Sequence, residues 1–194
     1  MLAGPHPRSW LLLVSQTRSS QRPQALMPSP IGHSLLGVSA AWLAAPRAGR
    51  SLAIACGILA ALPDVDVLFG GHRGATHSLG AVVVTSVAVA AFMAWRKLPV
   101  VRAVAACGPA YASHLLLDWL GKDTAAPYGI TAFWPFSSQY YSSGANLFLE
   151  ISRRYWKPEE FIFGNLHSLM REVAILLPVL ALTYWWKRRN EVHT

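Results

Sequence analysis

Four histidines and three aspartates stand out in a chain that otherwise avoids charge. In sequence order they are His33, Asp64, Asp66, His72, His77, His114 and Asp118. Ionisable side chains are costly in apolar surroundings unless a partner stabilises them. Imidazole and carboxylate groups bind divalent transition metals, so a metal ion is the simplest such partner. The residue types therefore predict a metal site of the kind that activates water for hydrolysis.

The first two carboxylates belong to the segment LPDVDV. Pro63 disfavours helical dihedrals at Leu62, so the preceding helix is expected to end there. If the following stretch is extended, residues two apart point to the same side, and Asp64 and Asp66 present two carboxylates to one point. The alternative is a helix-terminating turn in which one aspartate caps the next element.

The second motif is HRGATHS, directly after the aspartates. Its histidines, His72 and His77, are separated by four residues, and nearby glycines permit a tight loop. One histidine here would more often be an ordinary loop residue, but two beside a pair of aspartates favour a metal. Thr76 or Ser78 can cap the helix that follows. Arg73 either neutralises the aspartates, holds an anionic substrate group such as phosphate, or lies among lipid headgroups.

The third motif, SHLLLD, places an imidazole and a carboxylate on one helix face. His114 and Asp118 are four residues apart, so they lie about one turn from each other. They are either two ligands or one ligand with its orienting partner; the alternative is a pair that ties two helices together. His33 begins the first helix and joins the set only because the predicted topology brings it to the same face.

The ligand types also indicate the metal. Imidazoles and carboxylates without cysteine suit zinc best, with Mn, Fe, Co or Ni as alternatives. Seven ligands exceed what one tetrahedral ion needs, so the site would hold one or two ions, with an aspartate bridging in the second case. A carboxylate that is not on the metal, Asp66 or Asp118, could act as general base, and Arg73 could assist catalysis.

Composition indicates an all-α membrane bundle. Of the 194 residues, 53% are hydrophobic and only 13% are charged, about half the roughly 25% of a soluble domain. The helical pattern recurs in five apolar stretches: Ser34–Ala45, Ser51–Leu62, Leu79–Trp95, Ala103–Leu120 and Val173–Trp186. The third and fourth approach the roughly 20 residues that a membrane span needs, whereas the first and last look short.

The charge pattern predicts the topology. The net charge is +8, but the basic residues form no stripe with interleaved aromatics, so nucleic-acid binding is not expected. In an up-down bundle the basic clusters Arg47–Arg50, Arg96–Arg102 and Lys187–Arg189 share one side, and every candidate ligand lies towards the other. Basic clusters are typical of the cytoplasmic side, so the site is predicted to face outward.

Three segments are predicted along the chain. Residues 1–26 are expected to be a disordered tail or an over-long gene start, residues 27–186 a single helical membrane domain, and residues 187–194 a basic tail. Within the domain, the long segment Gly121–Glu172 is rich in aromatics, as expected at a membrane interface. It could cover the site and shape its pocket. Membrane lipids and a lipid-like or small substrate are the expected partners.

Taken together, these motifs resemble the YdjM-type family of inner-membrane metal-dependent hydrolases. The resemblance rests on MPSPIGH, LPDVDV, HRGATHS and SHLLLDWL, followed by PYG and WPFS, and it runs from about Met27 to Trp186. It implies a bacterial, multi-pass inner-membrane protein with hydrolase activity whose metal residues are the seven named above. The family name is also associated with LexA binding, which implies a regulatory protein partner.

Three functions are therefore weighed. The first is a membrane-bound metal-dependent hydrolase of a phosphoester or other ester near the bilayer surface. The second is a metal transporter or sensor, which would need polar residues deep in the helices; Leu79–Trp95 offers only Thr85 and Ser86. The third is a non-catalytic regulatory membrane protein, although short turns such as Pro46–Arg50 offer little surface to a partner.

Overall fold

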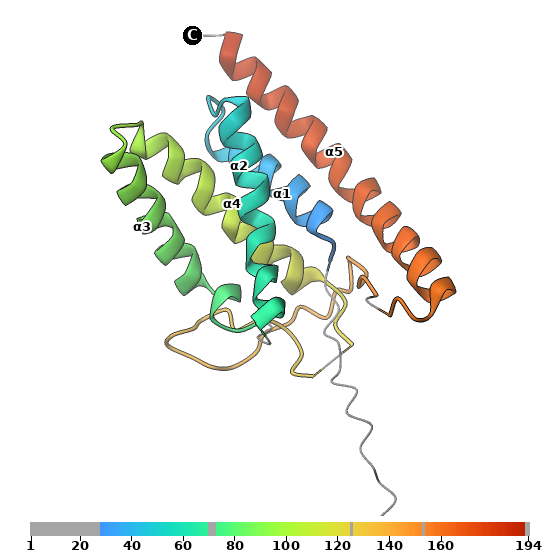
Figure 1. Ribbon diagram of the computed structural model, residues 1–194. Coiled ribbons are helices and arrows are strands. Elements are labelled where there is room, and N and C mark those ends of the chain that lie inside the picture. Colours follow the sequence, from blue (N-terminus) through green and yellow to red (C-terminus); the bar gives the residue numbers. More distant parts are fainter. Residues whose placement is uncertain (1–27, 70–72, 125, 153, 193–194) are drawn as a thin grey trace, which may run out of the picture.

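Five α-helices form the bundle that the sequence predicts (Figure 1). The structure is a computed structural model, and it describes residues 28–69, 73–124, 126–152 and 154–192. The helices are α1 (Pro30–Ala44), α2 (Arg50–Ala61), α3 (Leu79–Trp95), α4 (Val100–Leu120) and α5 (Asn165–Val192). The all-helical prediction is confirmed, while the expected tail of residues 1–26 and the candidate ligand His72 lie outside the described residues.

Short helices connect the long ones where the sequence analysis expected other structure. The segment LPDVDV forms the 3-10 helix η1 (Leu62–Phe69), followed by η2 (Ala75–His77), and the π-helix η3 (Glu160–Gly164) precedes α5. The predicted extended stretch is therefore wrong. Leu62 keeps right-handed helical dihedrals (φ −65°, ψ −36°) although it precedes Pro63, so the helical path of α2 continues through the proline into η1. Residues two apart on a three-residue turn point in different directions, so Asp64 and Asp66 diverge.

Among the residues that the structure describes, three helical stretches are long and apolar enough to cross a membrane. They are Arg50–Leu68, which joins α2 to most of η1, then Val100–Leu120, and Glu160–Glu191. The last apolar stretch thus extends well beyond its predicted ends, because the polar residues before it continue the helix. By contrast, α3 ends after 17 residues, at the lower limit of about 17–25 for a span.

The helices run alternately up and down, as predicted. Figure 1 shows the α1–α2 turn, the α3–α4 turn and the C-terminal end of α5 at one end of the bundle. The basic clusters lie in or beside these turns. At the opposite end, residues 121–124, 126–152 and 154–157 run beneath the helices without regular helices or strands, with isolated bridges from Gly121 to Phe148 and from Ile130 to Tyr141. Helix α1 packs against α2, α4 and α5, so its residues reach the middle of the bundle.

Glycines allow α1 and α2 to approach closely. A Cβ atom added at Gly37 would lie 2.4 Å from Ala60 Cβ and 3.1 Å from the Cys56 carbonyl oxygen. Across the same interface, a Cβ at Gly57 would lie 3.0 Å from Val38 Cγ2. Small residues at helix interfaces permit this close backbone contact. In a membrane the hydrophobic effect does not bring helices together, so van der Waals packing of this kind drives their association. The contact also fixes Ala60, whose carbonyl reaches the site described below.

Substitution Gly37→Ala is expected to destabilise the bundle. The added methyl group would force α1 and α2 apart, and overpacking of this kind costs about 1–3 kcal/mol. For a chain of this size each kcal/mol lowers the melting temperature by about 2–4 °C. Thermal unfolding of the detergent-purified protein would measure the change. The matched control is Gly164→Ala, where no atom lies within 4 Å of an added Cβ; an equal loss in both variants would contradict the packing argument.

Candidate metal centre

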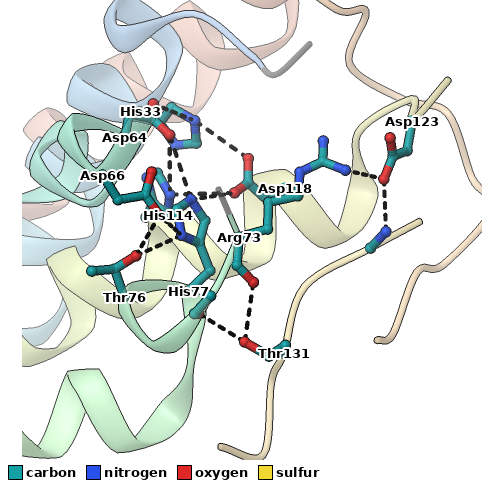
Figure 2. Close-up of polar contacts among 12 residues, drawn as sticks. His33, Asp64, Asp66, Arg73, Thr76, His77, His114, Asp118, Asp123 and Thr131 are labelled. Atoms are coloured by element: carbon teal, nitrogen blue, oxygen red, sulfur yellow. Dashed lines mark hydrogen bonds and ion pairs between the residues drawn. The ribbon is translucent and has the colours of Figure 1, made fainter. Parts of the chain in front are cut away.

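Side chains from four elements meet at the end of the bundle where α4 finishes and α1 begins. His33 comes from the first turns of α1, Asp64 and Asp66 from η1, His77 from η2, and His114 and Asp118 from the last turns of α4 (Figure 2). The three imidazoles are 0% exposed, and Asp118 is 4% exposed. The structure thus brings together six of the seven predicted residues, and the seventh, His72, is outside the described part.

Four of these residues form a tight group. Asp64, His77, His114 and Asp118 each offer one ligand atom, and these atoms lie within 4.8 Å of one another. The Nε2 atoms of both histidines face the same two oxygens. Asp64 Oδ1 lies 3.5 Å from His77 Nε2 and 3.6 Å from His114 Nε2. Asp118 Oδ2 lies 3.4 Å and 3.3 Å from the same two nitrogens. We call this group the His77–His114 pole.

His33 faces the other oxygen of each carboxylate. Its Nε2 lies 3.5 Å from Asp118 Oδ1 and 3.7 Å from Asp64 Oδ2, and its ring stacks on that of His114 with the centroids 4.0 Å apart. We call His33 Nε2 with these two oxygens the His33 pole. Asp64 and Asp118 therefore lie between two sets of nitrogen donors and present one oxygen to each.

His114 is oriented by the backbone of α2. Its Nδ1 lies 2.8 Å from the Ala60 carbonyl oxygen. A carbonyl only accepts, so Nδ1 carries the proton and Nε2 turns its lone pair towards the carboxylates. This is the usual second hydrogen bond of a metal-binding histidine. The close α1–α2 packing at Gly37 holds Ala60 in this position.

Asp66 and Thr76 contact the other side of the His77 ring. Asp66 Oδ2 lies 3.4 Å from His77 Nδ1, and the Thr76 hydroxyl donates to Asp66 over 2.8 Å. Asp66 therefore orients the His77 ring from the side opposite the His77–His114 pole. It is not one of the four residues that form that pole. Burial lowers the pKa of His77, but interactions with Asp64 and Asp66 outweigh it and raise this pKa to about 9. Because a metal ligand must be a neutral imidazole, binding of a cation would release this proton.

The site fits a divalent cation. Among the described residues, Asp64 Oδ1, both Asp118 oxygens, both His33 nitrogens and His114 Nε2 are buried without a hydrogen-bond partner. Buried polar atoms are rarely left without a hydrogen-bond partner, and a bound cation would satisfy these atoms together. The nitrogen–oxygen separations of 3.3–3.7 Å exceed ordinary hydrogen bonds. Imidazole and carboxylate donors without cysteine are suited to zinc and its neighbours.

Comparison with known proteins gives the family. Residues 27–193 match the profile of a family described as YdjM inner membrane protein. The chain belongs to this family. No curated protein and no solved structure is significantly similar to it. With three membrane-length helical stretches, this YdjM-family chain is an inner-membrane protein that carries a buried His/Asp group able to hold a metal ion.

In the YdjM-family protein, Arg73 points away from the poles. Its guanidinium pairs with Asp123, which also accepts a hydrogen bond of 2.7 Å from the Gly129 amide (Figure 2). Thr131 donates to the Arg73 and Gly74 carbonyls over 3.1 Å and 2.7 Å. These contacts fasten residues 73–74 to the segment below the bundle. The predicted catalytic assistance from Arg73 stays a prediction, and its described contact is structural.

Substitution Asp123→Ala is expected to destabilise the YdjM-family protein strongly. The side chains of Arg73 and Asp123 are only 4% and 5% exposed, and breaking a buried ion pair from one side costs about 3–5 kcal/mol. Thermal unfolding would show a melting temperature lower by about 6 °C or more. The control is Glu160→Ala, whose partners Arg154 and Lys157 are about half exposed, and it should melt near the wild type. Equal melting of both variants would contradict the assignment.

Three contributors to the site escaped sequence reasoning. The sequence predicts Thr76 or Ser78 as the cap of α3, and Ser78 is the cap, because its hydroxyl accepts from the Ala81 amide over 3.0 Å; Thr76 instead donates to Asp66. Ala60 acts through its carbonyl, which no side-chain pattern reveals. Glu172 in α5 is 0% exposed, and a lone acidic residue just before an apolar run is the signal that marks it.

Proposed function

We propose that this YdjM-family protein is a membrane-bound hydrolase that uses a divalent metal to cleave a phosphoester or other ester near the bilayer surface. The observation that carries the proposal is the group of buried imidazole and carboxylate side chains whose ligand atoms lie within 4.8 Å of one another at one end of a membrane-spanning bundle. Such groups are costly in these surroundings and mark functional sites. In the orientation that the positive-inside rule favours, this end faces away from the cytoplasm.

The arrangement of the nitrogen and oxygen donors supports a site for two metal ions, and zinc is the metal that we propose first. His77 and His114 would hold one and His33 the other, while Asp64 and Asp118 would serve both because each directs one oxygen to either pole. When bound, a pair of divalent ions makes water a stronger nucleophile and neutralises the charge that develops on an ester. Ala60 fixes the tautomer of His114, and Asp66 orients His77.

The exposure of the site residues supports approach from the η1 side. The side chains of Asp64 and Asp66 are 10% and 14% exposed, whereas those of the three histidines and Asp118 are 0% exposed. We assign proton transfer to Asp66, because it combines this exposure with a contact to His77. The same element, η1, carries exposed apolar side chains: Leu62, Val65 and Leu68 are 51%, 40% and 78% exposed. This surface supports a lipid-like substrate.

Hydrolysis by the detergent-purified protein tests the proposal. The substrates would be a soluble aryl phosphoester, an aryl carboxylic ester and phospholipids in mixed micelles. We expect release of product that a chelator abolishes and zinc restores, with the lipid substrates favoured. The chelator should also lower the melting temperature, because a ligand that binds only the folded state stabilises it. Stoichiometric zinc binding without hydrolysis of any substrate would overturn the proposal and favour a sensor.

A further inference from the structure

A completely buried carboxylate joins α5 to the beginning of α1. Glu172 is 0% exposed. Its Oε1 accepts a hydrogen bond of 2.7 Å from the Ser29 amide, and its Oε2 accepts one from the Ser29 hydroxyl. A Cβ atom added at Gly32 would lie 2.7 Å from Oε2, so a side chain at this position would displace the carboxylate from the first turn of α1. Both oxygens of Glu172 are thus committed to one residue of another helix.

Ser29 transmits this contact to His33. As N-cap of α1, its hydroxyl accepts from the Gly32 amide over 3.0 Å. Its carbonyl accepts from the His33 amide over 3.1 Å, the first helical hydrogen bond of α1. Residues four apart on a helix lie on one face. Glu172, Ser29 and the His33 backbone therefore form a continuous chain of hydrogen bonds that ends at the His33 pole.

His33 depends on this backbone more than the other histidines do. His114 is oriented by the Ala60 carbonyl, and His77 by Asp66 and Thr76. Neither ring nitrogen of His33 has a hydrogen-bond partner among the described residues. The direction of its ring is therefore set by the position of the first turn of α1 and by stacking on His114.

A cap alone does not require Glu172. The serine hydroxyl already satisfies the Gly32 amide, and a serine N-cap works without a carboxylate behind it. A carboxylate in a membrane-spanning stretch is costly and is retained where it serves a function. Its two hydrogen bonds limit how the start of α1 can move relative to α5.

We infer that Glu172 is a positioning residue of the metal centre, which holds the His33 imidazole against Asp64 and Asp118 by fixing Ser29. The inference rests on the proposed two-pole site. It predicts an effect confined to one pole: loss of Glu172 should weaken binding at the His33 pole and leave the His77–His114 pole intact. A residue needed only for folding would weaken both poles equally.

Zinc titration of the full-length, metal-stripped protein in detergent tests the inference. The wild type should bind zinc in two steps. Glu172→Leu should weaken one step by about 10–100-fold, the usual effect of losing an outer-shell partner, and Glu172→Gln, which keeps an acceptor, should recover part of it. The matched control is Ser168→Ala, which removes a part-buried hydrogen bond from α5 to the Glu150 carbonyl and leaves the contact with α1 in place. It should bind zinc like the wild type.

A double-mutant comparison makes the test specific. In a His33→Ala background, Glu172→Leu should change zinc affinity no further, because its effect passes through His33. Equal weakening of both steps, a further loss in the His33→Ala background, or wild-type binding by Glu172→Leu would each overturn the inference. If Glu172→Leu does not fold, Ser29→Ala and Gly32→Ala give the same comparison. Absence of zinc binding by the wild type would instead refute the proposed function.

Discussion

Asp118→Asn is expected to remove metal from both poles and to reduce hydrolysis to background. Asp118 presents Oδ2 to His77 and His114 and Oδ1 to His33. The amide keeps the size of the side chain but loses the negative charge and replaces one acceptor oxygen with an NH2 group, which only donates. Elemental analysis should show metal content falling from about two ions per chain, as in two-metal hydrolases, to well below one.

The control for this prediction is another acidic residue at the same end of the bundle. Glu150→Gln changes a carboxylate that accepts from the Thr124 hydroxyl over 2.5 Å in an exposed contact, away from the poles. It should keep full metal content and activity. If Asp118→Asn retained both ions in a monodisperse, folded protein, Asp118 would not lie between them and the two-pole arrangement would fail.

The sequence predicted which parts of the chain meet, but not how each residue contributes. Five apolar stretches and basic turns are enough to build an up-down bundle, and such a bundle must bring His33, the LPDVDV segment and SHLLLD to one end. Chain topology therefore gave the convergence. The distinction between Asp64 and Asp66 was out of reach, because it depends on η1 being a 3-10 helix and not an extended strand. The backbone after Pro63 stays helical because η1 continues directly from α2.

Contributions through the backbone were equally hidden. The Ala60 carbonyl orients His114 only because Gly37 lets α1 and α2 pack closely, and that is a property of two helices rather than of a motif. Glu172 reaches Ser29 across 143 positions of sequence, so its partner could not be read from spacing. Arg73 lies inside a motif that predicts a catalytic role, but its guanidinium forms an ion pair with Asp123, which is 50 residues away in sequence. Sequence spacing identifies local pairs, whereas pairing between distant loops requires the fold.

His33→Ala is expected to remove one ion and leave the other. Its Nε2 is the histidine nitrogen of the His33 pole, while the His77–His114 pole keeps all four of its grouped residues. Metal content should therefore fall by about half, and hydrolysis should fall much further, because a two-metal mechanism needs both ions to stabilise the attacking and leaving oxygens. Elemental analysis and the chelator-sensitive assay on the same preparation would measure the two effects.

His114→Ala provides the contrast, since it removes a donor from the other pole. Its Nε2 faces Asp64 Oδ1 and Asp118 Oδ2, the oxygens that His33 does not face. The two single variants should each keep about one ion, and the double variant His33→Ala/His114→Ala should keep almost none. If His33→Ala alone kept the full metal content, the His33 pole would not hold an ion. His33 would then act by packing its ring on His114, and the hydrolase would have to work with a single metal.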